Sequence, residues 1–231
     1  MTGPVALVGG GPGDPGLLTL RAEALLAAAQ IVVVDRPLLP AAALRAPRAQ
    51  LVVVEEGAGA GAELLAAAAA ATGPVVRLYR GDPWLHPAHQ REASALRAAG
   101  VATEAVPGVA TEVALPGLAG VPLHVRPVAV TATFARPETA PSSSDPARTL
   151  VVTTADVRTA AAGLVPIGSA AVLSTREAVA VAVAGSAAGS AGPAQVRRGP
   201  LATVAQWAPA GPGLVVCGAV AALDTTGGTA S

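Results

Sequence analysis

The chain has 231 residues, 52% of them hydrophobic, and 15 basic against 15 acidic side chains give a formal net charge of +0. This balance argues against a nucleic-acid partner, because such proteins usually carry a basic patch and a high pI. The sequence holds no strongly apolar run of about 20 residues, so we expect no membrane span. A single cysteine, Cys217, excludes a disulfide within the chain and favours a reducing, cytoplasmic location.

The first apolar segment, residues 5–8, runs into a turn rich in glycine and proline and then into a helix expected over 17–29. Consecutive glycines permit positive φ and let a ligand approach the main chain closely. Pro12 and Pro15 stiffen the same turn. Parallel α/β sheets bind ligands at the carboxyl ends of their strands, so this turn is predicted to be a ligand-binding loop. No basic stretch precedes the strand, and we expect no signal peptide.

Strands and helices then alternate along the chain. Strands are predicted at 31–34, 51–54, 75–79 and 102–106, and helices at 63–71 and 89–99. The alternation indicates an α/β fold with parallel strands buried on both faces. Further strands are predicted at 128–131, 150–153, 170–173 and 213–218.

A change of composition after Arg126 suggests two domains. We expect an N-terminal α/β domain over 1–124, a C-terminal α/β domain over 125–223 and a cleft between them. The tail over 224–231 is expected to be disordered.

Several blocks occur in a fixed order along the chain. The sequence GGGPGDP at 9–15 is followed by LLTL at 17–20, DR at 35–36, RLYRGDPW at 77–84, PGV at 107–109 and QVRRGPL at 195–201. Together they resemble the tetrapyrrole methylases, in particular the uroporphyrinogen-III C-methyltransferases. The resemblance is clear to about residue 126 and thinner beyond it.

This resemblance implies a two-domain fold with a mainly parallel N-terminal sheet and a mixed C-terminal sheet. It implies S-adenosylmethionine as co-substrate, bound between the domains of a subunit that is usually part of a homodimer. The implied reaction transfers methyl groups to ring carbons of uroporphyrinogen III, giving precorrin-2 for sirohaem or cobalamin synthesis. That substrate carries many carboxylates, which arginine binds in a bidentate way.

The same resemblance implies the site residues. Asp35 matches the proposed proton acceptor, and its place at a strand end independently suits a functional acid, the alternative being a helix or turn cap. The residues matched to the cofactor site are Pro12, Arg80, Gly81, Asp82, Leu85, Ala110, Thr111 and Thr154.

Other positions depart from the family pattern. Arg80 stands where a glycine is usual, Ala88 replaces an arginine, and Arg176 replaces a glycine. These departures leave two alternatives open. The chain is a non-catalytic member of the family that binds a tetrapyrrole or a protein partner, or it is a methylase of a later precorrin intermediate. A dehydrogenase is disfavoured because the prolines of the first loop break the Gly-x-Gly-x-x-Gly pattern.

His86 and His89 are three residues apart, which would place them on one face of a helix. Pro87 lies between them and disfavours a helix there. No further cysteine or histidine lies nearby to complete a ligand set, so no metal site is expected.

Overall fold

The computed structural model describes residues 4–55, 58–86, 88–126, 130–135, 140, 148–154, 169–174, 196–200, 206 and 213–222. Arg176 and the tail over 224–231 lie outside these residues. The chain divides into two compact units, and within the described residues the break falls between Thr111 and Glu112. The boundary expected near residue 124 stays a prediction.

The first unit is built on five parallel strands in the order β3-β2-β4-β1-β5. All five predicted strands are confirmed within one or two residues: β1 (Val5–Gly9), β2 (Ile31–Asp35), β3 (Gln50–Val54), β4 (Val75–Tyr79) and β5 (Thr103–Val106). Four helices accompany them: α1 (Leu20–Ala28), α2 (Leu39–Arg45), α3 (Gly61–Ala70) and α4 (His89–Ala98).

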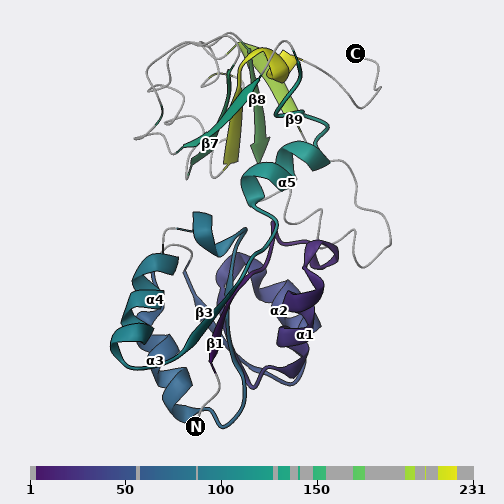
Figure 1. Cartoon of the computed structure of the whole chain (residues 1–231). Coiled ribbons are helices and arrows are strands. Elements are labelled where there is room, and N and C mark those ends of the chain that lie inside the picture. Colours follow the sequence, from purple (N-terminus) through teal and green to yellow (C-terminus); the bar gives the residue numbers. More distant parts are fainter. Residues whose placement is uncertain are drawn as a thin grey trace. The chain divides into compact units, whose positions relative to one another are not determined.

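Alternate residues of the central strands enter two hydrophobic clusters. Val5 and Leu7 of β1 pack with Leu64 of α3, whereas Ala6 and Val8 pack with the α1 side of the sheet. Figure 1 shows α3 and α4 on one face of this sheet and α1 and α2 on the other. The prediction of strands buried on both faces is therefore confirmed for β1, β2 and β4, all of whose residues are buried.

Two helices of the first unit differ from the sequence expectation. The helix predicted from residue 17 begins at Leu20, because the Thr19 side chain accepts a hydrogen bond from Ala22 N at 3.1 Å and caps it. Helix α2 was not predicted. It begins with Pro40 in its first turn, a position where proline is tolerated because its missing N–H has no partner inside the helix.

The strand order places a topological switch point between β1 and β4. These strands are hydrogen-bonded neighbours, yet β1 leads to α1 on one face and β4 leads to α4 on the other. The loops that follow them therefore diverge at the carboxyl edge of the sheet. Open α/β sheets bind ligands at such a point.

Helix α5 (Thr111–Leu118) begins with the last residue of the first unit and continues into the second, which also contains a mixed five-stranded sheet in the order β6-β7-β10-β8-β9. Its strands are β6 (Thr131–Ala135), β7 (Arg148–Thr154), β8 (Ser169–Ser174), β9 (Val196–Pro200) and β10 (Gly213–Cys217). Strand β6 pairs with β7 in parallel, whereas β10 lies antiparallel to both β7 and β8. The α/β class and the mixed second sheet are thus confirmed.

Details of the second unit differ from the expectation. A strand was predicted at 128–131; residues 128 and 129 lie outside the described part of the chain, and β6 begins at Thr131. Helix α5 and strand β9 were not predicted. Leu115 of α5 packs with Val151 and Leu214 of the sheet. Cys217 is buried in β10, and burial raises the pKa of its thiol to about 12, in keeping with a small apolar role. Among the described residues, no helix is long and apolar enough to cross a membrane.

Candidate functional site

Glycine main chain from separate loops meets at the switch point. Gly81 N donates to Gly11 O at 2.8 Å, and Gly11 N donates to Gly81 O at 3.2 Å, which forms an isolated antiparallel bridge. Both residues have positive φ, 68° at Gly11 and 72° at Gly81. Other residues adopt this conformation only with strain, which explains the glycines.

A third loop, after β5, closes against the first two. A Cβ atom built on Gly9 would lie 2.5 Å from Gly108 N, and one built on Gly108 would lie 2.6 Å from Gly81 O. No side chain fits between these main-chain segments. Gly9, Gly11, Gly81 and Gly108 therefore form a compact arrangement of bare backbone, here called the glycine cradle.

Asp82 fastens two of the three loops together. Its Oδ1 atom accepts a hydrogen bond from Trp84 N at 2.8 Å, and its Oδ2 atom accepts one from Gly108 N at 2.8 Å. The first bond is the turn-forming contact expected of an aspartate before a proline. The second makes the turn part of the cradle, so the main chain is rigid where it could meet a ligand.

Thr111 supplies a buried hydroxyl beside the cradle. Its side chain is 5% exposed, and Oγ1 has no hydrogen-bond partner among the described residues. A Cβ atom on Gly81 would lie 3.0 Å from this oxygen. Buried hydroxyls in folded proteins are nearly always paired, so a polar group of a ligand fits this position.

Most of the predicted cofactor residues belong to the loops of the cradle. They are Pro12, Arg80, Gly81, Asp82, Ala110 and Thr111. Leu85 is 53% exposed and lines a neighbouring cavity, whereas Thr154 is the last residue of β7 in the second unit. The role of each in cofactor binding stays a prediction.

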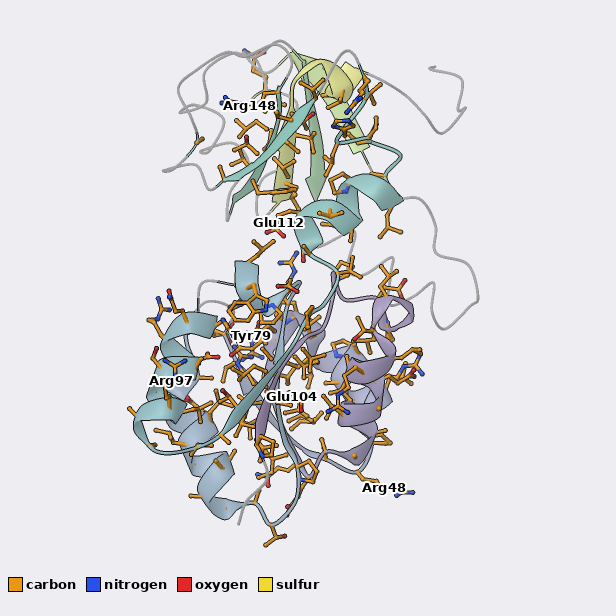
Figure 2. The ribbon with its side chains drawn as sticks, viewed as in Figure 1. Arg48, Tyr79, Arg97, Glu104, Glu112 and Arg148 are labelled. Atoms are coloured by element: carbon orange, nitrogen blue, oxygen red, sulfur yellow. The ribbon has the colours of Figure 1, made fainter. Side chains whose placement is uncertain are left out.

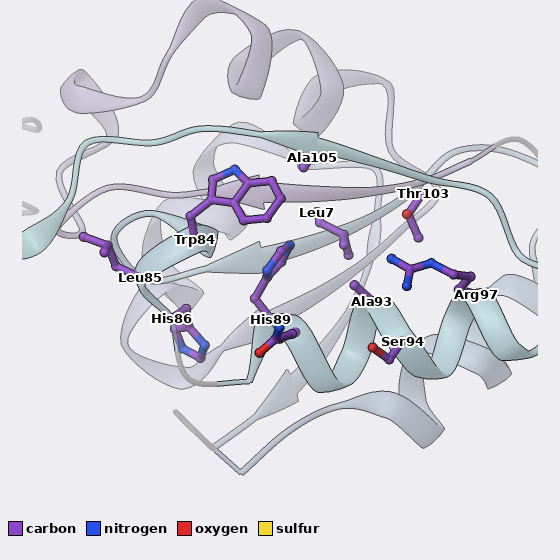
Figure 3. Close-up of a pocket in the computed structure, with 11 residues that line it drawn as sticks. Leu7, Trp84, Leu85, His86, His89, Ala93, Ser94, Arg97, Thr103 and Ala105 are labelled. Carbon is purple, nitrogen blue, oxygen red and sulfur yellow. The ribbon is translucent and has the colours of Figure 1, made fainter.

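The neighbouring cavity has a volume of about 620 Å³ and lies between α4, β5 and the Trp84 loop. Figure 3 shows the Trp84 indole beside the His89 ring, and Arg97 of α4 reaching toward Thr103 of β5. The Trp84 and His89 ring centroids are 4.7 Å apart in an edge-on contact. Burial lowers the pKa of His89 below its ordinary value.

His86 lies next to the Asp35 carboxylate. Its Nδ1 atom accepts a hydrogen bond from Ala88 N at 3.2 Å, and its Nε2 atom lies 3.1 Å from Asp35 Oδ2. Within the described residues, no three His, Cys, Asp or Glu side chains are grouped so that they could hold a metal ion.

Asp35 closes β2 as expected, but its side chain is fully buried and does not cap the turn that follows. Asp35 Oδ1 accepts a hydrogen bond from Arg77 Nη2 at 2.7 Å, and Oδ2 accepts one from Arg80 N at 3.0 Å. Burial alone would raise the pKa of Asp35. The His86 contact, the charge of Arg77 and the Arg80 N–H together hold that pKa below its ordinary value.

Arg77 and Glu92 complete this buried ionic cluster. Arg77 is 0% exposed, and its Nε donates to Glu92 Oε2 at 3.0 Å. Glu92 is 1% exposed and also accepts a hydrogen bond from Ala60 N at 2.6 Å. The carboxylates of Asp35 and Glu92 thus share one guanidinium. The charge of Asp35 and Glu92, together with direct contacts, holds the pKa of Arg77 above its ordinary value despite burial, which acts to lower it.

Sequence reasoning did not single out Arg77 as a site residue. Its guanidinium also donates from Nη1 to Leu78 O at 3.0 Å and lies 4.3 Å from the centre of the Tyr79 ring. Figure 2 shows Tyr79 inside the first unit. One feature of the sequence could have indicated the buried ion pairs of Arg77, namely an arginine within an otherwise apolar strand. Arginine is almost never fully buried unless it is paired.

Known proteins resemble this chain over most of its length. A profile of the tetrapyrrole (corrin/porphyrin) methylases matches residues 4–205. The uroporphyrinogen-III C-methyltransferase of Synechocystis sp. is 36% identical over 143 residues, which cover 58% of this chain and 54% of that protein. Siroheme synthase 2 of Aeromonas salmonicida is 38% identical over 141 residues, which cover 57% of this chain and 29% of that protein. The matched part thus spans about half, or less, of these relatives' own length.

Solved structures extend the similarity over nearly the whole chain. The crystal structure of uroporphyrin-III-C-methyltransferase from Thermus thermophilus has 30% sequence identity and a TM-score of 0.74, covering 96% of this chain and 94% of that one. A Thermus thermophilus structure complexed with S-adenyl homocysteine has 28% identity and a TM-score of 0.72, covering 94% and 98% of the two chains. With its ordered motifs, its two sheets and this profile match, the chain belongs to the tetrapyrrole methylases.

Proposed function

We propose that the chain is an S-adenosylmethionine-dependent methyltransferase that methylates ring carbons of uroporphyrinogen III. The product would be precorrin-2, which serves sirohaem or cobalamin synthesis. Relatives that carry the name of this activity support the proposal. The observation that carries it is the glycine cradle with the unpaired Thr111 hydroxyl at the switch point of the parallel sheet.

The cradle fits the co-substrate in two respects. Bare main chain at Gly81 and Gly108 allows close approach, and the Thr111 hydroxyl is available for a polar group. S-adenosylmethionine supplies a methyl group already activated by a sulfonium. The residues at 80–82, with Pro12, Ala110 and Thr111, would hold and orient it, and alignment of two reactive partners lowers a barrier by several kcal/mol.

A specific observation also supports a second candidate, a member that binds a tetrapyrrole or a partner without catalysis. Asp35 has 0% exposure and a polar partner at each carboxylate oxygen, so the matched proton acceptor does not face solvent. Ala88 is also fully buried and offers no side-chain donor where the family has arginine. This candidate predicts no methyl transfer to any tetrapyrrole.

Calorimetric titration of the purified protein with S-adenosylhomocysteine tests the cofactor site. Saturable binding near one site per chain is expected, and absence of heat well above micromolar concentration would contradict the methyltransferase. Thr111→Val is expected to weaken binding while leaving stability unchanged, because it removes an unpaired hydroxyl. Thr149→Val is the matched control, since Thr149 Oγ1 is equally buried and unpaired among the described residues but lies in β7.

An assay with S-adenosylmethionine and uroporphyrinogen III then separates the candidates. A methylated tetrapyrrole identified by mass spectrometry supports the proposed reaction. Methylation of a later precorrin, without methylation of uroporphyrinogen III, would instead support a methylase of that later intermediate. Binding of S-adenosylhomocysteine without turnover of either substrate would favour the non-catalytic candidate. We also propose that the protein is a homodimer and lies in the cytoplasm. Light scattering after gel filtration measures its molar mass and so tests the homodimer.

A further inference from the structure

The buried ionic cluster is connected directly to the loop that follows β4. One Asp35 oxygen is held by Arg77 Nη2 at 2.7 Å, and the other accepts the main-chain N–H of Arg80 at 3.0 Å. Arg80 is followed at once by Gly81 and Asp82, the cradle residues of this loop. The Asp35 carboxylate is therefore hydrogen-bonded to the main chain at Arg80, where the loop begins.

Arg77 is itself held from every side. Its Nε and Nη2 atoms face Glu92, its Nη1 donates to Leu78 O, and the Tyr79 ring lies 4.3 Å from its Cζ. A planar fork with donors on three edges can meet all of these partners at once, whereas a lysine ammonium cannot. The arginine is thus a fixed point to which Asp35 is attached.

Glu92 gives the cluster its second anchor. Its Oε1 atom accepts the main-chain N–H of Ala60, just before α3, at 2.6 Å, and Glu92 itself lies in α4. The chain of contacts runs from α3 and α4 through Arg77 and Asp35 to Arg80 N. It thus links the helical layer on one face of the sheet to the loop at the carboxyl ends of the strands.

We propose that Arg77 is a positioning residue for cofactor binding: by clamping Asp35, it fixes the main chain at Arg80 and hence the presentation of Gly81 and Asp82. The inference rests on the proposed function, because the ligand whose affinity it controls is the methyl donor. It assigns to Asp35 a main-chain-holding role that is independent of proton transfer. A core arginine that served stability alone would not alter the affinity of the folded protein.

The test compares Arg77→Lys, Asp35→Asn and the double variant with wild type. Arg21→Lys is the matched control, because Arg21 contacts Glu104 through Nε at 3.2 Å and Nη2 at 2.7 Å, as Arg77 contacts Glu92 through Nε and Nη2, but on the surface. Two quantities are measured for each folded protein. They are the exchange rate of the Arg80 amide hydrogen without ligand, followed by NMR, and the dissociation constant of S-adenosylhomocysteine.

Arg77→Lys is expected to speed Arg80 amide exchange about tenfold or more, because the hydrogen bond to Asp35 opens more often. It is expected to weaken S-adenosylhomocysteine binding by about tenfold, and Arg21→Lys should stay within about twofold of wild type. If Arg77 acts through Asp35, the double variant has a dissociation constant for S-adenosylhomocysteine no higher than that of the single variant that binds less tightly. The effects of the two substitutions are then not additive.

An unchanged dissociation constant in folded Arg77→Lys overturns the inference while leaving the methyltransferase intact, as do fully additive effects. If wild type does not bind S-adenosylhomocysteine, the proposed function fails, and the Arg80 exchange rate alone decides whether Arg77 positions the loop. If Arg77→Lys does not fold, R77M/E92Q is compared with E92Q. The R77M/E92Q variant removes the Arg77 guanidinium together with the charge of Glu92, so that only the Asp35 carboxylate loses its partner.

Discussion

The carboxylate of Asp82 accepts a hydrogen bond from the main-chain N–H of Gly108, 26 residues further along the chain. The same side chain accepts the N–H of Trp84 within its own turn. One residue therefore shapes the loop after β4 and fastens it to the loop after β5. Its two oxygens stabilise a surface made almost wholly of backbone.

Asp82→Ala removes both acceptors and is expected to lower the free energy of unfolding by about 1–3 kcal/mol, because two main-chain donors lose a charged partner. Asp14→Ala is the control, since Asp14 makes a corresponding turn contact with Gly16 N at 2.7 Å within its own loop. Its expected cost is about 0.5–1 kcal/mol. Urea unfolding measures both, and equal costs would contradict the role of Asp82 in joining two loops.

Gly108→Ala is expected to destabilise the first unit by about 1–3 kcal/mol, because the new methyl group collides with main chain that cannot move aside. Its Cβ would lie 2.6 Å from Gly81 O and 2.7 Å from Gly9 Cα. Gly117→Ala is expected to raise the free energy of unfolding instead of lowering it. Nothing among the described residues lies within 4 Å of a Cβ atom at this position, and the residue is in α5. A gain of about 0.5–1 kcal/mol is expected for that helical site. Thermal unfolding of the two variants checks the contrast.

Arg77→Met should cost about 3–5 kcal/mol of stability, because it leaves two buried carboxylates without their cation. Arg21→Met removes the cation of an exposed pair with Glu104, for which about 0–1 kcal/mol is expected. Chemical denaturation of both variants provides the comparison. Similar losses at the two sites would mean that the carboxylates of the buried cluster are stabilised mainly by other groups.

Acid should unfold the protein partly through Asp35. Because the folded-state pKa of Asp35 lies below its ordinary value of 3.8, the group stabilises the fold above that value, and this contribution is lost as pH falls through the folded-state pKa. Stability should therefore fall below about pH 4, and less steeply in Asp35→Asn. Urea midpoints between about pH 6 and pH 2 test this expectation, and parallel curves for the two proteins would exclude it.

The parallel sheet was predictable because most of its strands are short, mainly apolar runs and are followed within three residues by glycine, proline or aspartate. Helix α5 was hidden by Pro116 in its interior, since proline usually ends a helix. Helix α2 was hidden by its length of seven residues and by Pro40. In both cases packing against the sheet stabilises a helix that local preference does not favour.

The candidate site was predictable where its chemistry belongs to the main chain. Gly81 and Asp82 stand out by residue type, and the structure places them with Thr111 and Gly108. The environment of Asp35 was not predictable, because its partner Arg77 lies 42 residues away and only the strand order makes them neighbours. The sequence shows which charges are present, but not that two carboxylates share one guanidinium.

Because the cradle joins the loops after β1, β4 and β5, it exists only when strands far apart in sequence have already paired. A ligand held there binds the complete sheet and has no comparable partner in the unfolded chain. Binding would then stabilise the first unit as a whole, by about 2.7 kcal/mol at a free ligand concentration 100 times its dissociation constant. Core amides of β1 and β4 would then gain protection from hydrogen exchange together with the loops. The methyl donor would thus stabilise the whole folded unit that binds it.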